Sequence, residues 1–107
     1  MWLGDQLTSW DAWDGLASAV IGLMSGGLSG LALSHSDIGG YTSWDGDRLS
    51  LPGIRVQRTP ELFTRWAEFA AFTPVYRTHP GSDSLHDWQF DSDNATAALF
   101  ARMAGMY

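Results

Sequence analysis

Reactive side chains follow three separate apolar segments of this 107-residue chain. They are, in chain order, Asp5, then His35 and Asp37, then Arg77 and His79. Ligands of parallel α/β folds bind at the carboxyl ends of strands, so polar groups that directly follow apolar segments indicate a site there. The repetition is more informative than any single residue, and it predicts one site built from three segments.

On residue type alone, each of these side chains has two interpretations. Asp5 is either a turn or capping aspartate, or a general acid whose pKa would have to be raised by partial burial. Asp37 is either an acceptor that orders its loop or a ligand for hydroxyl groups. His35 fits loop ordering better than chemistry. His79 either binds hydroxyl groups or pairs with Asp37.

The segment 31–41 is the centre of this prediction. A short apolar run ends in His35 and Asp37, followed by Gly39, Gly40 and Tyr41. Glycine adopts backbone angles that other residues avoid and allows the chain to approach a ligand closely. We expect a buried strand that opens into a tight loop presenting a carboxylate, an imidazole and a phenol. A polar loop with two turn glycines and no ligand is the alternative.

Alternating elements must position these residues. The predicted strands are 1–4, 28–34 and 72–76, and the predicted helices are 12–24, 60–71 and 94–103. This β-α-β-α-β-α order predicts parallel strands joined by crossover helices. Because a full (β/α)₈ barrel takes roughly 250 residues, three such units make up well under half of one.

Local signals set the expected helix boundaries. Ser9 or Asp11 can cap the first helix, Gly26 and Gly27 are expected to end it, and its apolar residues predict a mostly buried element. Thr59-Pro60-Glu61 is a strong start for the second helix, with a cap, a proline and an acid. Asp93 or Ser92 caps the third helix. The polar stretch 42–59 is too long for a plain connector and predicts a rim or lid loop.

Composition excludes several classes of function. The net charge of −6, with six Arg and no Lys, argues against nucleic acid or an anionic membrane as a partner. The absence of cysteine rules out disulfides and thiolate metal ligation. His35, Asp37, His79 and His86 have no recognised zinc spacing, so we expect neither a metal nor another cofactor.

The N-terminal residues have neither a basic region nor an apolar core of the kind found in signal peptides, and no apolar run reaches 18 residues. These features predict a cytoplasmic protein without a transmembrane helix. Residues 1–4 resemble the end of a strand whose beginning is missing.

Motifs spread over nearly the whole chain resemble glycoside hydrolase family 31. In order, they are Trp2-Leu3-Gly4-Asp5-Gln6, Gly30 with Ser36-Asp37-Ile38-Gly39-Gly40-Tyr41, Arg65-Trp66 with Phe69, and Ala71-Phe72-Thr73-Pro74 with Arg77-Thr78-His79. The resemblance implies a (β/α)₈ barrel that cleaves α-glycosides with retention. It implies that residues 1–107 are one partial catalytic barrel domain, from the end of the sixth strand to the start of the eighth helix.

The same resemblance assigns roles to individual residues. It makes Asp5 the general acid/base, and it places Trp2, Asp37 and His79 in the pocket of the reacting sugar. The nucleophilic Asp of the family lies on an earlier strand, outside this sequence, so the isolated chain is expected to be inactive.

Within the family, the sulfoquinovosidase branch is the best match. Gln6, Tyr41 and the run Asp87-Trp88-Gln89-Phe90-Asp91 resemble that branch, whose tyrosine helps to hold the sulfonate of the sugar. The expected substrate is therefore an α-sulfoquinovoside, and the remainder of the barrel is the expected structural partner. The alternatives are another α-glucosidase of the family, or a sugar-binding α/β domain without catalysis.

Overall fold

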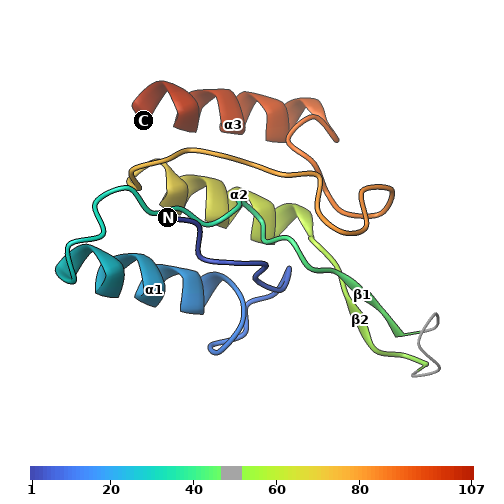
Figure 1. Ribbon diagram of the computed structural model, residues 1–107. Coiled ribbons are helices and arrows are strands. Elements are labelled where there is room, and N and C mark those ends of the chain that lie inside the picture. The colour runs from blue at the N-terminus through green and yellow to red at the C-terminus, as the bar shows by residue number, and fades with distance from the viewer. Residues whose placement is uncertain (47–51) are drawn as a thin grey trace.

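Three helices and one short hairpin form the regular structure of residues 1–46 and 52–107, the part of the chain that the computed structural model describes (Figure 1). They are α1 (Leu16–Leu28), β1 (Trp44–Asp45), β2 (Arg55–Val56), α2 (Pro60–Ala70) and α3 (Asn94–Met106). Helix α2 lies between α1 and α3 in Figure 1, and the hairpin projects away from the helices. No helix in these two ranges is long and apolar enough to cross a membrane.

Three isolated parallel β-bridges join the segments that flank helices α1 and α2. They join Trp2 to His35, Leu7 to Thr42, and Ile38 to Thr78. The backbone bonds Leu3 N to His35 O (3.0 Å) and Ile38 N to Arg77 O (2.9 Å) support two of them. The predicted parallel arrangement of neighbouring segments is therefore present, with α1 and α2 as the crossovers.

The continuous strands predicted at 1–4, 28–34 and 72–76 do not form within the described residues. Leu28 instead completes α1, and Gly30 turns the chain with a φ of 85°. After α2, the amides of Phe72 and Thr73 bond back to Phe69 O and Ala70 O, which extends helical turning into the predicted strand. Isolated β-bridges join these segments, instead of the continuous hydrogen-bonded ladders that were expected.

Helix α1 lies four residues further along the chain than predicted at both ends. Asp11 does not cap it: its carboxylate accepts from the amides of Trp13 (2.7 Å) and Asp14 (3.0 Å) and forms a turn before the helix. Gly26 and Gly27 do not end it either, because they remain inside the last turns.

The end of α1 is a Schellman motif around Gly30. The amide of Leu31 bonds to Gly26 O (2.9 Å), and the amide of Gly30 bonds to Gly27 O (3.1 Å). This pattern requires a left-handed residue at the position of Gly30, which glycine adopts without a Cβ clash. Gly30 therefore ends the helix, and Gly26 and Gly27 do not.

Helices α2 and α3 begin where the sequence predicts. The Thr59 hydroxyl accepts from the amide of Leu62 (3.2 Å), and Pro60 takes the first position of α2. The Asp93 carboxylate accepts from the amide of Thr96 (2.7 Å), a bond that holds the pKa of Asp93 below its usual value. Helix α3 continues three residues beyond its predicted end, to Met106.

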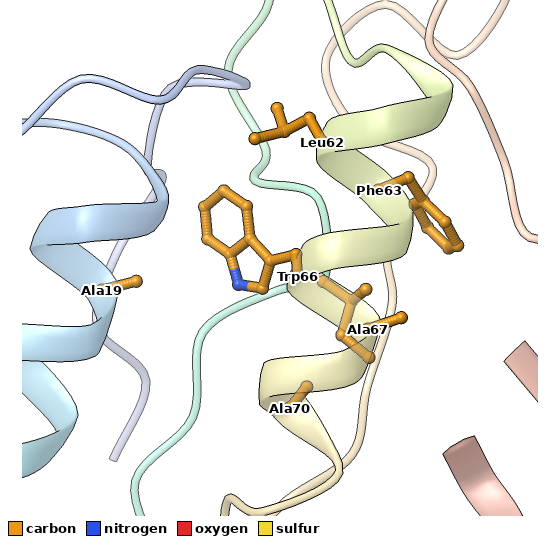
Figure 2. Packing of buried hydrophobic residues seen from close by; sticks show 7 residues of the cluster. Ala19, Leu62, Phe63, Trp66, Ala67 and Ala70 are labelled. Atoms are coloured by element: carbon orange, nitrogen blue, oxygen red, sulfur yellow. The ribbon is translucent and has the colours of Figure 1, made fainter.

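The core lies around α2. Its buried members are Ala19, Ile38, Leu62, Phe63, Trp66, Ala67 and Ala70. Figure 2 shows the Trp66 ring between α2 and α1, facing Ala19, while Phe63 lies on the opposite side of α2. There the Phe63 ring meets Phe100 of α3 with centroids 5.8 Å apart. Helix α2 is therefore covered from both sides.

Helix α1 is less buried than its apolar content predicts. Only Ala19 and Gly26 are buried along it, whereas Ile21, Met24 and Leu28 are 64%, 66% and 91% exposed. The prediction of a mostly buried helix is wrong for the chain as described, since one face of α1 packs on α2 and the other has no cover from these residues.

Part of the polar stretch 42–59 forms a hairpin that the sequence did not predict. Strand β1 pairs with β2 in antiparallel register, with Trp44 opposite Val56 and Asp45 opposite Arg55. Residues 47–51, at the centre of the predicted rim or lid loop, lie outside the described residues.

Candidate active site

A pocket of ≈ 320 Å³ brings the predicted site residues together. Its lining consists of Trp2, Asp5, Asp37, Tyr41, Arg77 and His79. All five residues named as catalytic or substrate-binding from the sequence are in this set. Arg77, which the sequence placed at a strand end without a defined role, joins them. His35 is not among the lining residues.

The parallel bridges explain how residues far apart in the chain meet here. Trp2 lies beside His35, so Asp5 and Asp37, which follow them, emerge on the same side of the paired segments. Ile38 lies beside Thr78, which sets Asp37 next to Arg77 and brings in His79. The site is thus located where the three parallel segments end, as the pattern of apolar runs predicts.

Asp37 is a buried carboxylate held beside Arg77. Its side chain is only 2% exposed, and Oδ1 lies 3.5 Å from Nε of Arg77. Oδ1 is fully buried and accepts no hydrogen bond within the described residues, so the Arg77 guanidinium is its charge partner. The ion pair of Asp37 is with Arg77, not with His79.

The orientation of His79 is fixed by its own loop. Its Nδ1 accepts a hydrogen bond from the amide of Gly81 (3.1 Å), so the neutral ring carries its proton on Nε2. The ring also packs at 60° against Tyr41, with centroids 5.0 Å apart. His79 can therefore donate from Nε2, beside the phenol of Tyr41.

Asp5 and Trp2 form the open side of the pocket. Asp5 is exposed, so the partial burial expected of a general acid is not provided by the described residues. Trp2 keeps 47% of its surface exposed. The backbone at Asp5 is held in place, because its carbonyl accepts from the hydroxyl of Thr42 (2.9 Å).

Arg58, which was not predicted as a functional residue, lies directly behind the pocket. Arg58 is 2% exposed and donates to the carbonyls of Gly39 (3.2 Å) and His79 (2.9 Å), and also to that of Gly40. Burial lowers the pKa of its guanidinium, and the nearby Asp87 and Asp37 carboxylates act in the opposite direction.

One signal could have found Arg58. It immediately precedes the N-cap Thr59, where the helix dipole disfavours a positive charge. A cation at such a place needs another partner, and here the partners are backbone carbonyls of the site loops.

No metal centre accompanies the pocket in the described ranges. Across residues 1–46 and 52–107, no three His, Asp or Glu side chains gather closely enough to hold an ion. His86 pairs with Asp83 (2.9 Å) on the surface and takes no part in the lining.

Comparison with known proteins gives a consistent family relationship. The chain is 45% identical over all 107 residues to the sulfoquinovosidase of Escherichia coli K12, and 46% identical to that of Agrobacterium fabrum. It spans only 14% and 15% of those two proteins. More distant relatives include the glucosidase 2 subunit alpha of Schizosaccharomyces pombe, 30% identical over 78% of this chain and 7% of that protein.

A solved structure agrees with these relatives. The family 31 sulfoquinovosidase from E. rectale, in complex with an aza-sugar inhibitor, matches with a TM-score of 0.78 and 43% identity over 98% of this chain and 14% of that one. The family model for the glycosyl hydrolases family 31 TIM-barrel domain matches residues 1–104. The chain belongs to glycoside hydrolase family 31, as part of its TIM-barrel domain.

Proposed function

We propose that this chain is the part of a retaining α-glycosidase that runs from the end of the sixth barrel strand to the start of the eighth helix. The substrate of the complete enzyme is an α-sulfoquinovoside. The observation that carries this proposal is the lining of the pocket, which contains every residue to which the family motifs give a role.

Asp5 serves as the general acid/base in this proposal. Retention requires a second carboxylate as nucleophile about 5–5.5 Å away. Asp37 is not that nucleophile, because its ion pair with Arg77 and its deep burial suit a binding role better than attack on a sugar carbon. The exposed side of Asp5 is then the side on which earlier barrel strands place the nucleophile and exclude water.

The pocket residues offer different kinds of contact to a sugar. Asp37 lines the pocket with a carboxylate that can accept from a sugar hydroxyl, and His79 Nε2 is available to donate to one. The Trp2 ring offers a flat apolar wall for the sugar face. Tyr41 supplies a phenol donor for the anionic group at the far carbon of the sugar.

The relatives support sulfonated sugars over plain glucosides. Three sulfoquinovosidases share 43–46% identity with nearly the whole chain, whereas the glucosidase 2 subunit alpha shares 30% over a shorter stretch. A plain α-glucosidase remains the second candidate because the two activities share the acid/base and most of the pocket.

Hydrolysis by the full-length protein tests the proposal. The 4-nitrophenyl α-glycosides of sulfoquinovose and glucose would be compared by kcat/KM, and proton NMR would identify the anomer released first. We expect a strong preference for the sulfoquinovoside and initial release of the α-anomer. Preference for the glucoside would favour the second candidate, and sugar binding without hydrolysis would favour a non-catalytic domain.

A further inference from the structure

We infer that Arg58 is a positioning residue, which sets Tyr41 and His79 in place by fastening together the two loops that carry them. This inference rests on the proposed function, because Tyr41 and His79 act there as substrate-binding groups. Arg58 itself is not one of the residues that line the pocket. Its effect on substrate is therefore indirect.

The guanidinium joins loops that are distant in the chain. Nε donates to Gly39 O (3.2 Å), and one terminal nitrogen donates to Gly40 O, directly before Tyr41. The other terminal nitrogen donates to His79 O (2.9 Å). One side chain thus holds the backbone at both pocket residues, whose rings pack against each other 5.0 Å apart.

The surroundings leave the guanidinium no room to move. A Cβ added at Gly39 would lie 2.6 Å from Arg58 Cδ and Nε. A Cβ added at Gly81 would lie 3.1 Å from a terminal nitrogen of Arg58 and 2.7 Å from the Asp87 carboxylate. Both glycines also have positive φ angles, 87° and 85°. The two loops therefore close tightly around Arg58.

Asp87 completes the arrangement from the other side. Its Oδ1 accepts from the amide of Arg58 (3.0 Å), and both oxygens accept from the Ser43 hydroxyl (2.6 and 2.7 Å). The backbone of residue 58 is thereby fixed, so the direction of its side chain is set before the guanidinium reaches the loops. Asp87 also balances a positive charge that burial would otherwise penalise.

Lysine cannot replace this function. Its ammonium is a single point on a flexible stem, whereas the planar guanidinium presents donors in several fixed directions at once. Arg58→Lys keeps the positive charge but loses the hydrogen bonds to at least one of the two loops. We expect the Tyr41 and His79 side chains to shift relative to each other while the core around α2 remains intact.

A double-mutant cycle in the full-length enzyme tests the inference. The proteins are the parent, Arg58→Lys, His79→Ala and the double variant, assayed with 4-nitrophenyl α-sulfoquinovoside at matched folded concentration. We expect Arg58→Lys to raise KM by about tenfold in the parent and by less than about threefold in the His79→Ala background, because coupled residues are not additive. Arg65→Lys is the comparison variant, since Arg65 lies on α2 outside the pocket lining and, among the described residues, pairs with Glu68 (2.8 Å).

The outcomes separate this inference from the proposed function. Equal KM effects of Arg58→Lys in both backgrounds, or a lower melting temperature with unchanged KM, would overturn the positioning role. If the parent hydrolyses no α-glycoside, the proposed function fails, and a crystal structure of Arg58→Lys then decides the inference. Displaced Tyr41 and His79 rings would support it, and rings in their parental places would refute it.

Discussion

Two carboxylates of the pocket differ in ways that suit different tasks. Asp37 is buried against Arg77 and keeps one oxygen free of hydrogen bonds, whereas Asp5 is exposed and its backbone is tied by Thr42. A buried carboxylate held beside a cation suits a binding role, because it can accept charge-assisted hydrogen bonds from a ligand. A carboxyl group that must exchange protons benefits from an environment that changes when the remaining barrel and a substrate close around it.

Replacement of Asp5 tests its assignment as acid/base. Asp5→Ala in the full-length enzyme should reduce activity most for substrates with poor leaving groups, because those need protonation of the glycosidic oxygen. Activated aryl glycosides should lose much less in the first step, and added azide should restore turnover. Steady-state rates over a series of leaving groups provide the measurement. Equal losses for every leaving group without azide rescue would give Asp5 a structural role.

Replacement of Tyr41 tests which sugar the enzyme prefers. Without its hydroxyl, a bound sulfonate lacks one donor, at a cost of roughly 1.5–3 kcal/mol or about tenfold to a hundredfold in kcat/KM. Tyr41→Phe should therefore weaken hydrolysis of sulfoquinovosides and leave α-glucosides nearly unchanged. The ratio of the two kcat/KM values, variant over parent, is the quantity to measure. An unchanged ratio would mean that Tyr41 only packs against His79.

The pocket-lining residues were predicted from the sequence, whereas Arg58 behind the pocket was not. Asp5, Asp37 and His79 each follow an apolar run, so the periodicity of the chain marks them. Arg58 lies in a polar stretch with no apolar run before it, and its carbonyl partners have no sequence signature. Backbone acceptors become visible only when the loops that carry them are placed in space.

At the scale of elements, the helix starts that are set by side-chain caps were predictable, whereas the glycine that ends α1 was not. Thr59 and Asp93 each begin a helix by a local bond that depends on two or three adjacent residues. The end of α1 depends on which of Gly26, Gly27 and Gly30 adopts a positive φ, and all three have the same chemistry. The choice among them is seen only in the contacts after the helix, where the amide of Leu31 bonds back to Gly26 O (2.9 Å).

Trp66 connects the core to the site. Its ring is fully buried between α1 and α2, and its Nε1 donates to the hydroxyl of Ser36 (3.0 Å), next to Asp37. The same helix therefore supplies the apolar packing and one of the bonds that hold the segment before the pocket loop.

Substitution of Trp66 by phenylalanine isolates that bond. Trp66→Phe in the full-length protein should cost about 1–3 kcal/mol of stability, because the buried Ser36 hydroxyl loses its partner. Some packing loss adds to this cost. Thermal or chemical unfolding of variant and parent provides the measurement. A melting temperature equal to that of the parent would contradict the role given to Trp66.

At the scale of the whole molecule, the chain pairs its parallel segments with single bridges instead of ladders. The bridges at Trp2, Leu7 and Ile38 place the segments correctly but bury few backbone groups. In a closed barrel each strand has a neighbour on both sides, and helices cover the outer face. The sequence motifs identified the barrel family correctly, yet continuous strands in this region need neighbours that residues 1–107 do not supply.

The isolated 107-residue chain should consequently be a poor folding unit. Ile21, Met24, Leu28 and Leu33 are 64–91% exposed, so α1 and the segment after it present an uncovered apolar surface. Segments with unpaired backbone groups beside such a surface invite association. We expect residues 1–107 alone to self-associate in sedimentation velocity and to unfold without a sharp transition by circular dichroism, whereas the full-length protein should melt cooperatively. Leu28→Lys in the isolated chain should reduce association without producing a sharp transition, because it removes apolar surface but adds no neighbour. A monomer of residues 1–107 with a steep, cooperative melt would show that this part of the barrel folds independently.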